Sequence, residues 1–598
     1  MTEPGRPQGQ GEASRRTSPL SRRRMLGGSL ALVGALLAAC RGASQPENFT
    51  ETPPEAETAA TPVPATAIPA ATPNVGATAT ARTLLQSLRM PITEPPTLDP
   101  ALATDHASVQ VAVQLFEGLT EIDQGGQPAP LGAERWETAD DGRTYTFVLR
   151  GDRLWSNGAP VTAHDYVWAW RRAIDPRTAA DYASLFYAIK NGSRIHNERL
   201  DAALLGVTAR DNKTLVVNLE EPLAHFPWLT SLITFAPLKK EALEAFGDRW
   251  TRPENIITNG PFKLVEWTHD KQITLERNPT YPGADRLMPR VTLRIFPDDA
   301  AAQVLTAYEG SSLDAMGTGA SFEIPAAEVE RVMSDATART IARTTLQSGT
   351  LFLAVNTRRP HLQDARVRRA LGQVIERDKV LKDVLRRVGT PALGLAPDGI
   401  VGRDEGRWPV EDIGAARASM LDAGFPDGKG FPPISFAFNT SAQWSQLGEY
   451  LKQRYKDSLG IELTLKPMDW VAFTKWRRSD EWTTDGDLLR GGWLSDYEDP
   501  FNWYNQIWDS RDDAAAYNTA WKHDFYDALV REGAMTVART ERADLYNRAD
   551  EILAAEYPAI PIFHYASRTL VRPYVGGFAP ERVLSLVRLK RVTVDEAR

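Results

Sequence analysis

The residue types that most often carry enzyme chemistry are present, but their spacing does not form a reactive site. No two histidines share the spacing that would place both on one helix face as metal ligands; they lie at positions 106, 164, 196, 225, 269, 361, 523 and 564. The segment 424–429 resembles a phosphate loop in composition, but it is one residue short and Gly430 replaces the required hydroxyl. No Gly-x-Ser-x-Gly motif occurs. We therefore predict no catalytic residue, no metal site and no cofactor.

Carboxylates and aromatic rings leave other possibilities open. Asp496 and Asp499 are close enough along the chain to form an acid and base pair, so a secreted hydrolase is one hypothesis, with carboxylate proximity as its only support. Tryptophan is abundant, with sixteen residues, and rigid aromatic side chains can wall a pocket that accepts varied ligands. Most of these tryptophans are expected in the core; the clusters are Trp168/Trp170, Trp470/Trp476/Trp482 and Trp493/Trp503/Trp508.

Strands and helices alternate from Thr83 onward, which indicates α/β lobes. Thr162 begins a helix with Asp165 three residues on, a near capping box, and Tyr166, Trp170 and Ile174 fall on one helix face. Strands are predicted at 144–150, 213–219, 261–267, 271–277, 291–296, 350–357, 433–440, 461–467 and 559–565, and further helices at 364–388, 445–459 and 541–556. At 598 residues the chain is too long for one core, and two or three packed units are expected.

The first forty residues read as an export signal. Three arginines, Arg22 to Arg24, precede a short apolar stretch, 27–39, that is too short to span a bilayer as a stable helix. The arginines resemble a twin-arginine signal, and the segment 37–40, Leu-Ala-Ala-Cys, resembles the lipobox of bacterial lipoproteins. Cys40 is the only cysteine, so we expect it to be lipidated and to anchor the protein to a membrane, with the protein facing the periplasm or the exterior.

Composition separates a linker from the folded part and argues against nucleic acid as a partner. Residues 41–82 are rich in Ala, Thr and Pro, which predicts a disordered, extended linker. Removing residues 1–40 takes away six arginines and two glutamates, which leaves 63 basic and 75 acidic side chains and a net charge of −12. An acidic surface repels phosphate backbones, and no basic stripe with interleaved aromatic residues offsets that repulsion.

Several motifs make the sequence resemble the oligopeptide-binding proteins of ABC importers, a group within the bacterial extracellular solute-binding proteins of family 5. The longest is residues 134–176, ERWETADDGRTYTFVLRGDRLWSNGAPVTAHDYVWAWRRAIDP. The others are LFEGL at 115–119, NGPF at 259–262, DARVRRAL at 364–371, GWLSDYEDP at 492–500 and RPYVGGF at 572–578. The resemblance covers nearly all of 83–598.

This resemblance implies an α/β fold of the periplasmic-binding-protein type, a bilobal clamp of type II with an extra subdomain. The implied divisions are lobe I at 83–116, 241–342 and 569–598, the extra subdomain at 117–240 and lobe II at 343–568. The ligand of such a protein is an extended peptide held between the lobes, which hydrogen-bonds to backbone while hydrated pockets take its side chains. The implied partners are the permease subunits of an ABC transporter, and a monomer is expected.

The resemblance also carries individual residues across. Asp496 matches the aspartate that pairs with the α-ammonium of the peptide, and Tyr182 matches a tyrosine that touches the peptide main chain. Trp493, with Leu494 beside it, and Trp470 match walls of side-chain pockets. Arg477 and Arg490 lie where family members use basic side chains toward the carboxyl terminus of the peptide; a structural or solvated role remains open for both.

Departures from the family pattern concern the details of the ligand. Thr104 and His106 stand where close relatives place a glutamate and a small apolar residue, Trp444 replaces an expected histidine, and four residues are inserted between Trp470 and Trp493. These differences leave the length and the carboxyl-terminal contacts of the peptide open. The same fold can also carry a nickel complex, haem, a cell-wall peptide or a sugar, and a lipid-anchored chaperone is a further alternative to the hydrolase.

Overall fold

The computed structural model describes residues 87–595 apart from 318–321, 326, 401–404, 512–516 and 518. All of these belong to one compact unit, Thr80–Arg598. The predicted export signal, Cys40 and the whole of the predicted linker, 41–82, lie outside the described residues, so the predictions made for them stay predictions. No helix of the described part combines the length and apolar character needed to cross a membrane.

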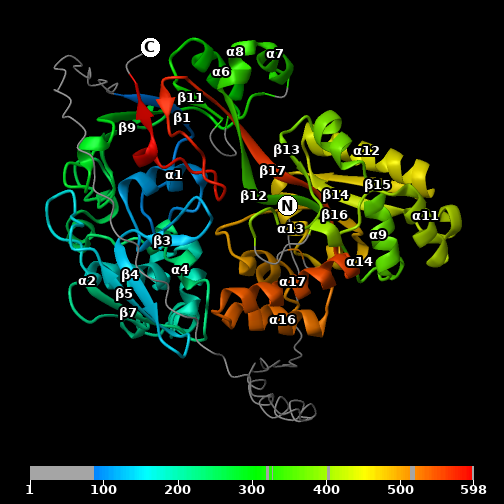
Figure 1. Cartoon of the computed structure of the whole chain (residues 1–598), viewed down its shortest axis with the longest axis horizontal. Helices are drawn as coiled ribbons and strands as arrows, with labels where there is room; N and C mark the ends of the chain where they lie inside the picture. Colours follow the sequence, from blue (N-terminus) through cyan, green and yellow to red (C-terminus); the bar gives the residue numbers. More distant parts are fainter. Residues whose placement is uncertain are drawn as a thin grey trace, which may run out of the picture. The chain divides into compact units, whose positions relative to one another are not determined.

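A four-stranded sheet with order β1-β10-β9-β8 lies beside helix α1, His106–Leu115 (Figure 1). Its strands are β1 Leu88–Ile92, β8 Phe262–Thr268, β9 Gln272–Arg277 and β10 Arg290–Ile295. The three predicted strands in this region are confirmed within one residue at each end, while β1 was not predicted. Strand β1 pairs parallel to β10 across about two hundred residues of chain, a contact for which the local sequence carries no signal.

Residues 117–240 contain a second four-stranded sheet, β4-β5-β7-β6. Its strands are β4 Ala133–Thr138, β5 Thr144–Leu149, β6 Val207–Ala209 and β7 Thr214–Asn218. Strand β5 alternates between half-buried and buried residues, as its sequence predicts for a sheet with one face in the core. This sheet and the first one contribute to a single apolar core.

Helix α2, Ala163–Ile174, forms where the capping box predicts it. The backbone N–H of Thr162 donates to the Asp165 carboxylate at 2.8 Å, so the carboxylate satisfies an amide that the helix leaves open. Tyr166, Trp170 and Ile174 are all buried on the core side.

The largest sheet has the order β11-β17-β12-β16-β14-β15, with β13 also paired to β17. Its strands are β11 Ala315–Met316, β12 Ala342–Val355, β13 Gly389–Pro391, β14 Ile434–Asn439, β15 Leu463–Met468, β16 Leu488–Leu494 and β17 Ala559–Val571. Strands β12 and β17 pair antiparallel over most of their length. A second apolar core packs around this sheet, and a smaller cluster includes Val304, Tyr308 and Leu570.

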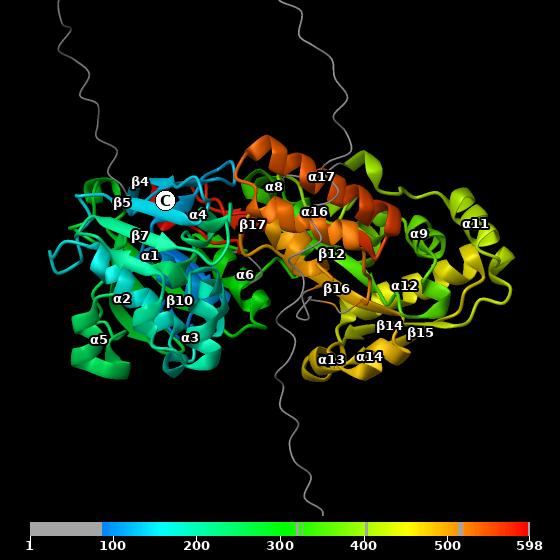
Figure 2. The ribbon, with the colours of Figure 1, turned by 90° about the horizontal axis from the view of Figure 1, so that it is seen from below.

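Helices cover this sheet, and Figure 2 shows α16, Asp524–Met535, packed beside α17, Arg539–Glu556. Helix α12, Ala442–Leu459, contacts β14 and β15. The single helix predicted over 364–388 is wrong. Helix α9, Ala365–Gln373, ends before Val374 and Ile375, and the chain leaves helical geometry at Glu376, where ψ is 86°. Val374 and Ile375 are β-branched, which weakens their preference for a helix. Both are fully buried, and this packing outweighs that preference.

The remaining elements are short. They are α3 Gly192–Glu198, α4 Phe226–Leu229, α5 Lys240–Phe246, α6 Ala301–Glu309, α7 Val329–Ser334, α8 Ala336–Ile341, α10 Arg377–Lys379, α11 Ile413–Asp422, α13 Trp470–Trp476, α14 Asp480–Asp485, α15 Gln506–Trp508, β2 Thr120–Ile122, β3 Pro128–Pro130, β18 Val575–Gly576 and β19 Thr593–Val594. The lobe and subdomain boundaries implied by the family resemblance stay a proposal.

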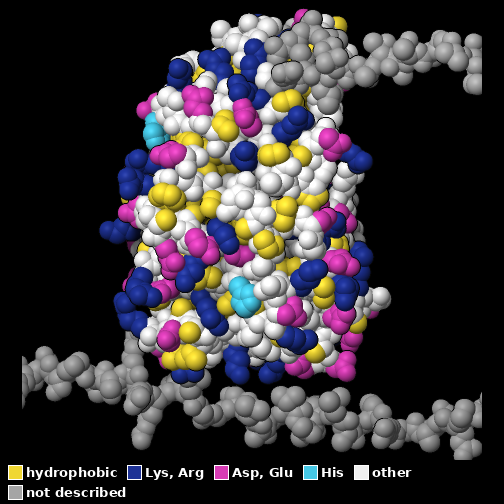
Figure 3. All heavy atoms as spheres, turned by 90° about the vertical axis from the view of Figure 1, so that its left-hand side faces the viewer, with side chains coloured by type: hydrophobic (Ala, Val, Ile, Leu, Met, Phe, Trp, Pro, Cys, Tyr) yellow, Lys and Arg dark blue, Asp and Glu magenta, His cyan; other side chains and the backbone are white. Residues whose placement is uncertain are grey.

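The surface carries both signs of charge. On the face that Figure 3 shows, Lys and Arg side chains are intermingled with Asp and Glu side chains, and neither sign gathers into a broad patch. A mixed surface of this kind gives a phosphate backbone no continuous basic track to follow.

A buried ion pair joins α17 to the segment that follows β16. Asp499 accepts two hydrogen bonds of 2.6 Å from the guanidinium of Arg542, whose Nε donates to the carbonyl of Gly533 at 2.9 Å. Burial alone would raise the pKa of Asp499, but the charge and hydrogen bonds of Arg542 outweigh it and hold that pKa below its usual range. Both ends of the pair are therefore satisfied inside the core.

Removing one end of this pair should destabilise the protein strongly. We expect Asp499→Ala to lower the free energy of unfolding by about 3–5 kcal/mol, because Arg542 is left as an unpaired buried charge. The matched control is Asp152→Ala, which breaks the exposed pair with Arg150 and should cost at most about 1 kcal/mol. Urea unfolding followed by tryptophan fluorescence measures both. Equal losses for the two variants would contradict the structural role of the buried pair.

Candidate functional site

A cavity of about 540 Å³ brings together two of the predicted site residues, Tyr182 and Asp496. Its walls come from α1, from the turn after β2, from the 3-10 segment 181–188, from residues 231–234 and from the C-terminal segment 577–591. Its volume falls within the range of sites that hold small ligands.

Asp496 has no cationic partner among the described residues. Its backbone N–H donates to Asn502 Oδ1 at 3.3 Å, and Asn502 Nδ2 donates to its carboxylate at 3.4 Å. Burial raises the pKa of Asp496, with only the Asn502 hydrogen bond acting in the other direction. Burial, and next the charge of Asp496, raises the pKa of Tyr182 to about 12. The pair thus offers a desolvated carboxylate and a protonated hydroxyl, which suits a cationic group of a ligand.

Bonds to two other segments, β12 and residues 502–503, fix the chain around Asp496. Ser495 N–H donates to the carbonyl of Ser348 on β12 at 2.8 Å, and Trp503 Nε1 donates to Ser495 Oγ at 2.7 Å. Trp493 Nε1 donates to Asn502 Oδ1 at 2.9 Å. Asn502, which the sequence did not single out, therefore orients both Trp493 and Asp496.

The carboxylate pair behind the hydrolase hypothesis is not available as a pair. Both oxygens of Asp499 are engaged by Arg542, whereas Asp496 lines the cavity. A carboxylate held below its usual pKa by a bidentate guanidinium is a poor general base. Of these two carboxylates, therefore, only Asp496 lies at the cavity, in a position suited to binding.

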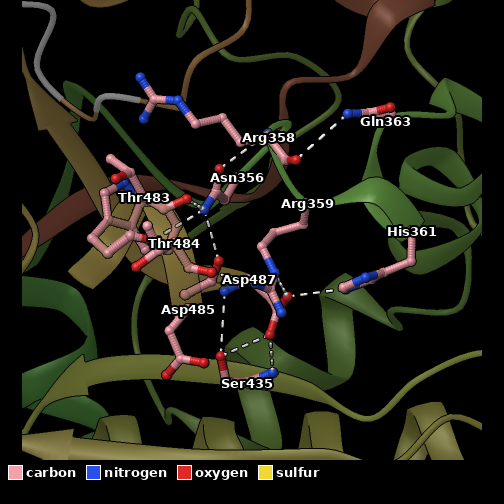
Figure 4. A network of polar contacts seen from close by, with 12 residues as sticks. Asn356, Arg358, Arg359, His361, Gln363, Ser435, Thr483, Thr484, Asp485 and Asp487 are labelled. Atoms are coloured by element: carbon pink, nitrogen blue, oxygen red, sulfur yellow. Dashed lines mark hydrogen bonds and ion pairs between the residues drawn. The ribbon is translucent and has the colours of Figure 1, made fainter. Parts of the chain in front are cut away.

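Strand β16 carries several candidate residues and is anchored at its start by Asp487 (Figure 4). The Asp487 carboxylate accepts from the backbone N–H and the hydroxyl of Ser435, both at 2.9 Å, and from Arg359 Nε at 3.0 Å. His361 Nε2 lies 2.9 Å from the same carboxylate. Burial alone would raise the pKa of Asp487, but these partners lower it. The network ties β16 to β14 and to the turn after β12, so it sets where the rest of the strand lies.

Arg477 and Arg490 lie near one another, among aromatic rings. The Arg490 guanidinium lies 4.5 Å from the ring centre of Trp444, and that of Arg477 lies 5.8 Å from the ring centre of Tyr517. Burial lowers the pKa of Arg477, and the charge of Arg490 contributes. Neither arginine has a carboxylate partner among the described residues, and both Nε atoms are buried without a hydrogen bond there. Two such cations are chemically suited to an anion.

The other predicted residues are placed less directly. Trp493 is half-buried against the large core, whereas Leu494 and Trp470, at the start of α13, are exposed. Thr104 precedes α1 and His106 begins it; neither lines the cavity, although the neighbouring Ala103 does. Arg477, Arg490, Trp470, Trp493 and Leu494 are likewise absent from its walls. Of the site residues predicted from the sequence, only Asp496 and Tyr182 meet in this cavity.

Comparison with known proteins identifies the family of this chain. Residues 127–515 match the model of the bacterial extracellular solute-binding proteins, family 5 middle. The chain belongs to this family. The chain is 32% identical over 498 residues to the probable deoxycholate-binding periplasmic protein YgiS of Escherichia coli, covering 81% of this chain and 89% of that one. It is 31% identical over 509 residues to the periplasmic oligopeptide-binding protein OppA of Salmonella typhimurium, covering 83% and 90%.

Solved structures of family 5 proteins agree. The unliganded open form of the murein tripeptide-binding protein MppA matches with a TM-score of 0.74 at 27% identity, covering 86% of this chain and 99% of that one. The fold class predicted from the sequence, an α/β bilobal clamp with an extra subdomain, is confirmed. The family resemblance inferred from the motifs is confirmed as well.

His225 is a buried residue of this family 5 chain that the sequence did not single out. Its ring centre lies 5.3 Å from that of Tyr497, with the planes 9° apart, and 4.2 Å from that of Phe501. Its Nδ1 is buried without a hydrogen-bond partner in the described part of the chain. The ring therefore joins the region of α4 to the segment that carries Asp496. Burial lowers the pKa of His225 to about 4, with Arg542 adding to the effect and Asp499 opposing it.

We expect His225 to make the protein less stable in acid. Between the ordinary histidine pKa of about 6.5 and a folded-state value of about 4, the unfolded chain binds a proton that the folded chain excludes, so stability falls as pH falls. His225→Phe keeps a stacked ring and removes this proton. Between pH 7 and pH 4.5, the loss of unfolding free energy should be roughly 2 to 3 kcal/mol smaller in His225→Phe than in wild type.

Urea unfolding at a series of pH values measures this difference. The control is His164→Phe at an exposed position of α2, which should keep the wild-type dependence on pH. Parallel pH profiles for wild type and His225→Phe would show that His225 is not excluded from protonation in the folded state.

Proposed function

We propose that this chain is an extracytoplasmic peptide-binding lipoprotein that captures oligopeptides between two lobes and delivers them to an ABC transporter, without enzymatic activity of its own. One observation carries the proposal: Asp496 is a half-buried carboxylate, without a cation of its own among the described residues, on the wall of a ligand-sized cavity that it shares with Tyr182. A free α-ammonium group is the charge that every unmodified peptide brings.

Peptides of different sequence share a backbone and two charged termini. A receptor for many peptides gains affinity from backbone hydrogen bonds and from the charged termini, because these do not depend on sequence. An ammonium group that leaves water needs a fixed counter-charge to offset its desolvation. Asp496 supplies that charge, and the arginine cluster at Arg477 and Arg490 supplies the opposite charge for a carboxylate.

The relatives support a peptide and name one other class of cargo. Their printed names include oligopeptide-binding, dipeptide-binding and murein peptide-binding proteins. YgiS is named for deoxycholate, a carboxylate with a large apolar body, and the mostly apolar cavity wall favours that cargo as a second candidate. Asp496 argues against it, because a second carboxylate in a desolvated cavity is repelled.

Asp496 should contribute more to peptide binding than any other polar side chain. We expect Asp496→Ala to weaken the binding of a free-amine peptide by at least a hundredfold, because removing one partner of a buried pair costs about 3–5 kcal/mol. Wild-type protein should reject the N-acetylated peptide to a similar degree. The two losses should not add, since both delete one ion pair. Calorimetry on the four combinations of protein and peptide measures this cycle.

The matched control is Asp544→Ala, at an exposed position of α17, which should bind as wild type does. The ligand-free Asp496→Ala protein should be no less stable than wild type, because the change removes a half-buried charge that has no ion-pair partner among the described residues. Tolerance of N-acetylation by wild type, or fully additive losses, would remove Asp496 from the site. Tight binding of deoxycholate with no peptide bound would favour the second candidate.

The arginine cluster should recognise the carboxyl terminus of the peptide. We expect amidation of that terminus to weaken wild-type binding by about tenfold to a hundredfold, as for a lost hydrogen bond to a charged group. In Arg477→Ala or Arg490→Ala, the difference between acid and amide should shrink or vanish, whereas Arg135→Ala, exposed on β4, should keep it. Calorimetry with the paired peptides tests this. Equal affinity for acid and amide in every protein would rule both arginines out.

A further inference from the structure

We infer that the cavity beside Asp496 selects ligands whose amino-terminal residue carries a large aliphatic side chain. The inference rests on the proposed function, because it takes Asp496 to hold the α-ammonium group. The side chain of the first residue branches one atom away from that group, so it must lie in the cavity that Asp496 lines.

The wall of the cavity is mainly aliphatic. Val109 and Val113 lie four residues apart on one face of α1 and are buried, and Leu232 and Leu185 are half-buried on the segments opposite. Ile122, Ile233 and Leu586 add to the apolar part. Tyr182 is the one aromatic residue among the lining residues that the structure describes. Such a wall gains free energy only from apolar surface that a ligand buries against it.

Most of the other charges at the cavity form ion pairs within the protein. Glu498 pairs with Arg582 at 2.8 Å, Glu581 with Arg588 at 3.1 Å, and Arg591 bonds to Glu121 at 3.2 Å. Asp123 is exposed, and its carboxylate accepts the amide N–H groups of two residues in its own turn.

Apart from the exposed Asp123, the wall offers no free partner to a charged first side chain that has lost its hydration. Asp496 is the half-buried charge that has no ion-pair partner among the described lining residues. The cavity therefore selects one positive charge next to apolar bulk.

The backbone of the C-terminal wall is strained, and bonds from another part of the fold hold it in this conformation. Leu584 and Ser585 both have positive φ angles, 54° and 52°, a conformation that non-glycine residues adopt rarely and at a cost of about 1–3 kcal/mol each. Gln347 Nε2 donates to Ser585 Oγ at 2.5 Å, and Ser348 N–H donates to the carbonyl of Arg582 at 2.8 Å. Bonds from β12 thus hold the loop, which presents Leu584 and Leu586 to the cavity.

The test is calorimetry of wild-type protein with tripeptides that differ only in the first residue, of the form X-Gly-Gly with a free amino terminus. Leu-Gly-Gly should bind about fiftyfold more tightly than Ala-Gly-Gly, as expected for three further buried carbon atoms at about 0.8 kcal/mol each. Ser-Gly-Gly and Asp-Gly-Gly should bind more weakly than Ala-Gly-Gly. The isomer Ala-Gly-Leu should not show the gain, since its leucine lies away from the ammonium group.

Variants locate the effect. Replacing Leu185 and Leu232 together by Asn should reduce the ratio between Leu-Gly-Gly and Ser-Gly-Gly by tenfold or more, whereas Leu421→Asn, exposed on α11, should leave it unchanged. Ala579→Phe, at an exposed position of the cavity wall, should weaken Leu-Gly-Gly and spare Gly-Gly-Gly, which keeps the test decisive if the double variant fails to fold.

The outcomes separate this inference from the function on which it rests. Binding that depends on the free amino terminus but not on the first side chain would overturn the aliphatic selection and leave the peptide receptor in place. An equal gain from leucine at the third position would also overturn it. Failure of every peptide, N-acetylated or free, would instead refute the proposed function.

Discussion

The ion pair between Asp499 and Arg542 fixes the segment on which the candidate site depends. Asp499 is held inside the core by two bonds of 2.6 Å, and Asp496 lies three residues earlier, with the fully buried Tyr497 between them. The position of Asp496 on the cavity wall therefore depends on the pair. The folding energy of the core supplies the cost of keeping an unpaired carboxylate desolvated. A ligand that brings a cation then meets a counter-charge already in position.

Charges inside this protein fall into two groups by whether the fold provides their partners. Glu117 contacts Tyr281, Lys590 and Arg153, and the Asp487 and Asp499 carboxylates are bound by Arg359 and Arg542 respectively. Asp496, Arg477 and Arg490 have no ion-pair partner among the described residues. Structural pairs account for the first group. The second group carries opposite charges at two places, which suits the proposed ligand, a peptide that brings both charges.

Local pattern predicted the elements but not the contacts that build the site. The alternation in β5 and the Thr162–Asp165 capping box of α2 are local, so they could be read from sequence. Strand β16 has the pair Gly491–Gly492 and no alternation, and it gains its place from Asp487 and from pairing with β12. Asn502 and His225 act through contacts with distant or folded-back segments and have no sequence signal of their own. Asp496 and Tyr182 were found through family resemblance, and their shared cavity needed the fold.

The departures from the family at Thr104 and His106 act at the edge of this cavity. Burial lowers the pKa of His106, while the backbone of Ser585 acts in the other direction and so lies against the ring. Ser585 is one of the two non-glycine residues with a positive φ in the C-terminal wall. Ala103, just before Thr104, lines the cavity itself. A change of residue type at 106 therefore alters the support of a strained wall, and the shape of the cavity follows from that support even though the side chain at 106 does not line it.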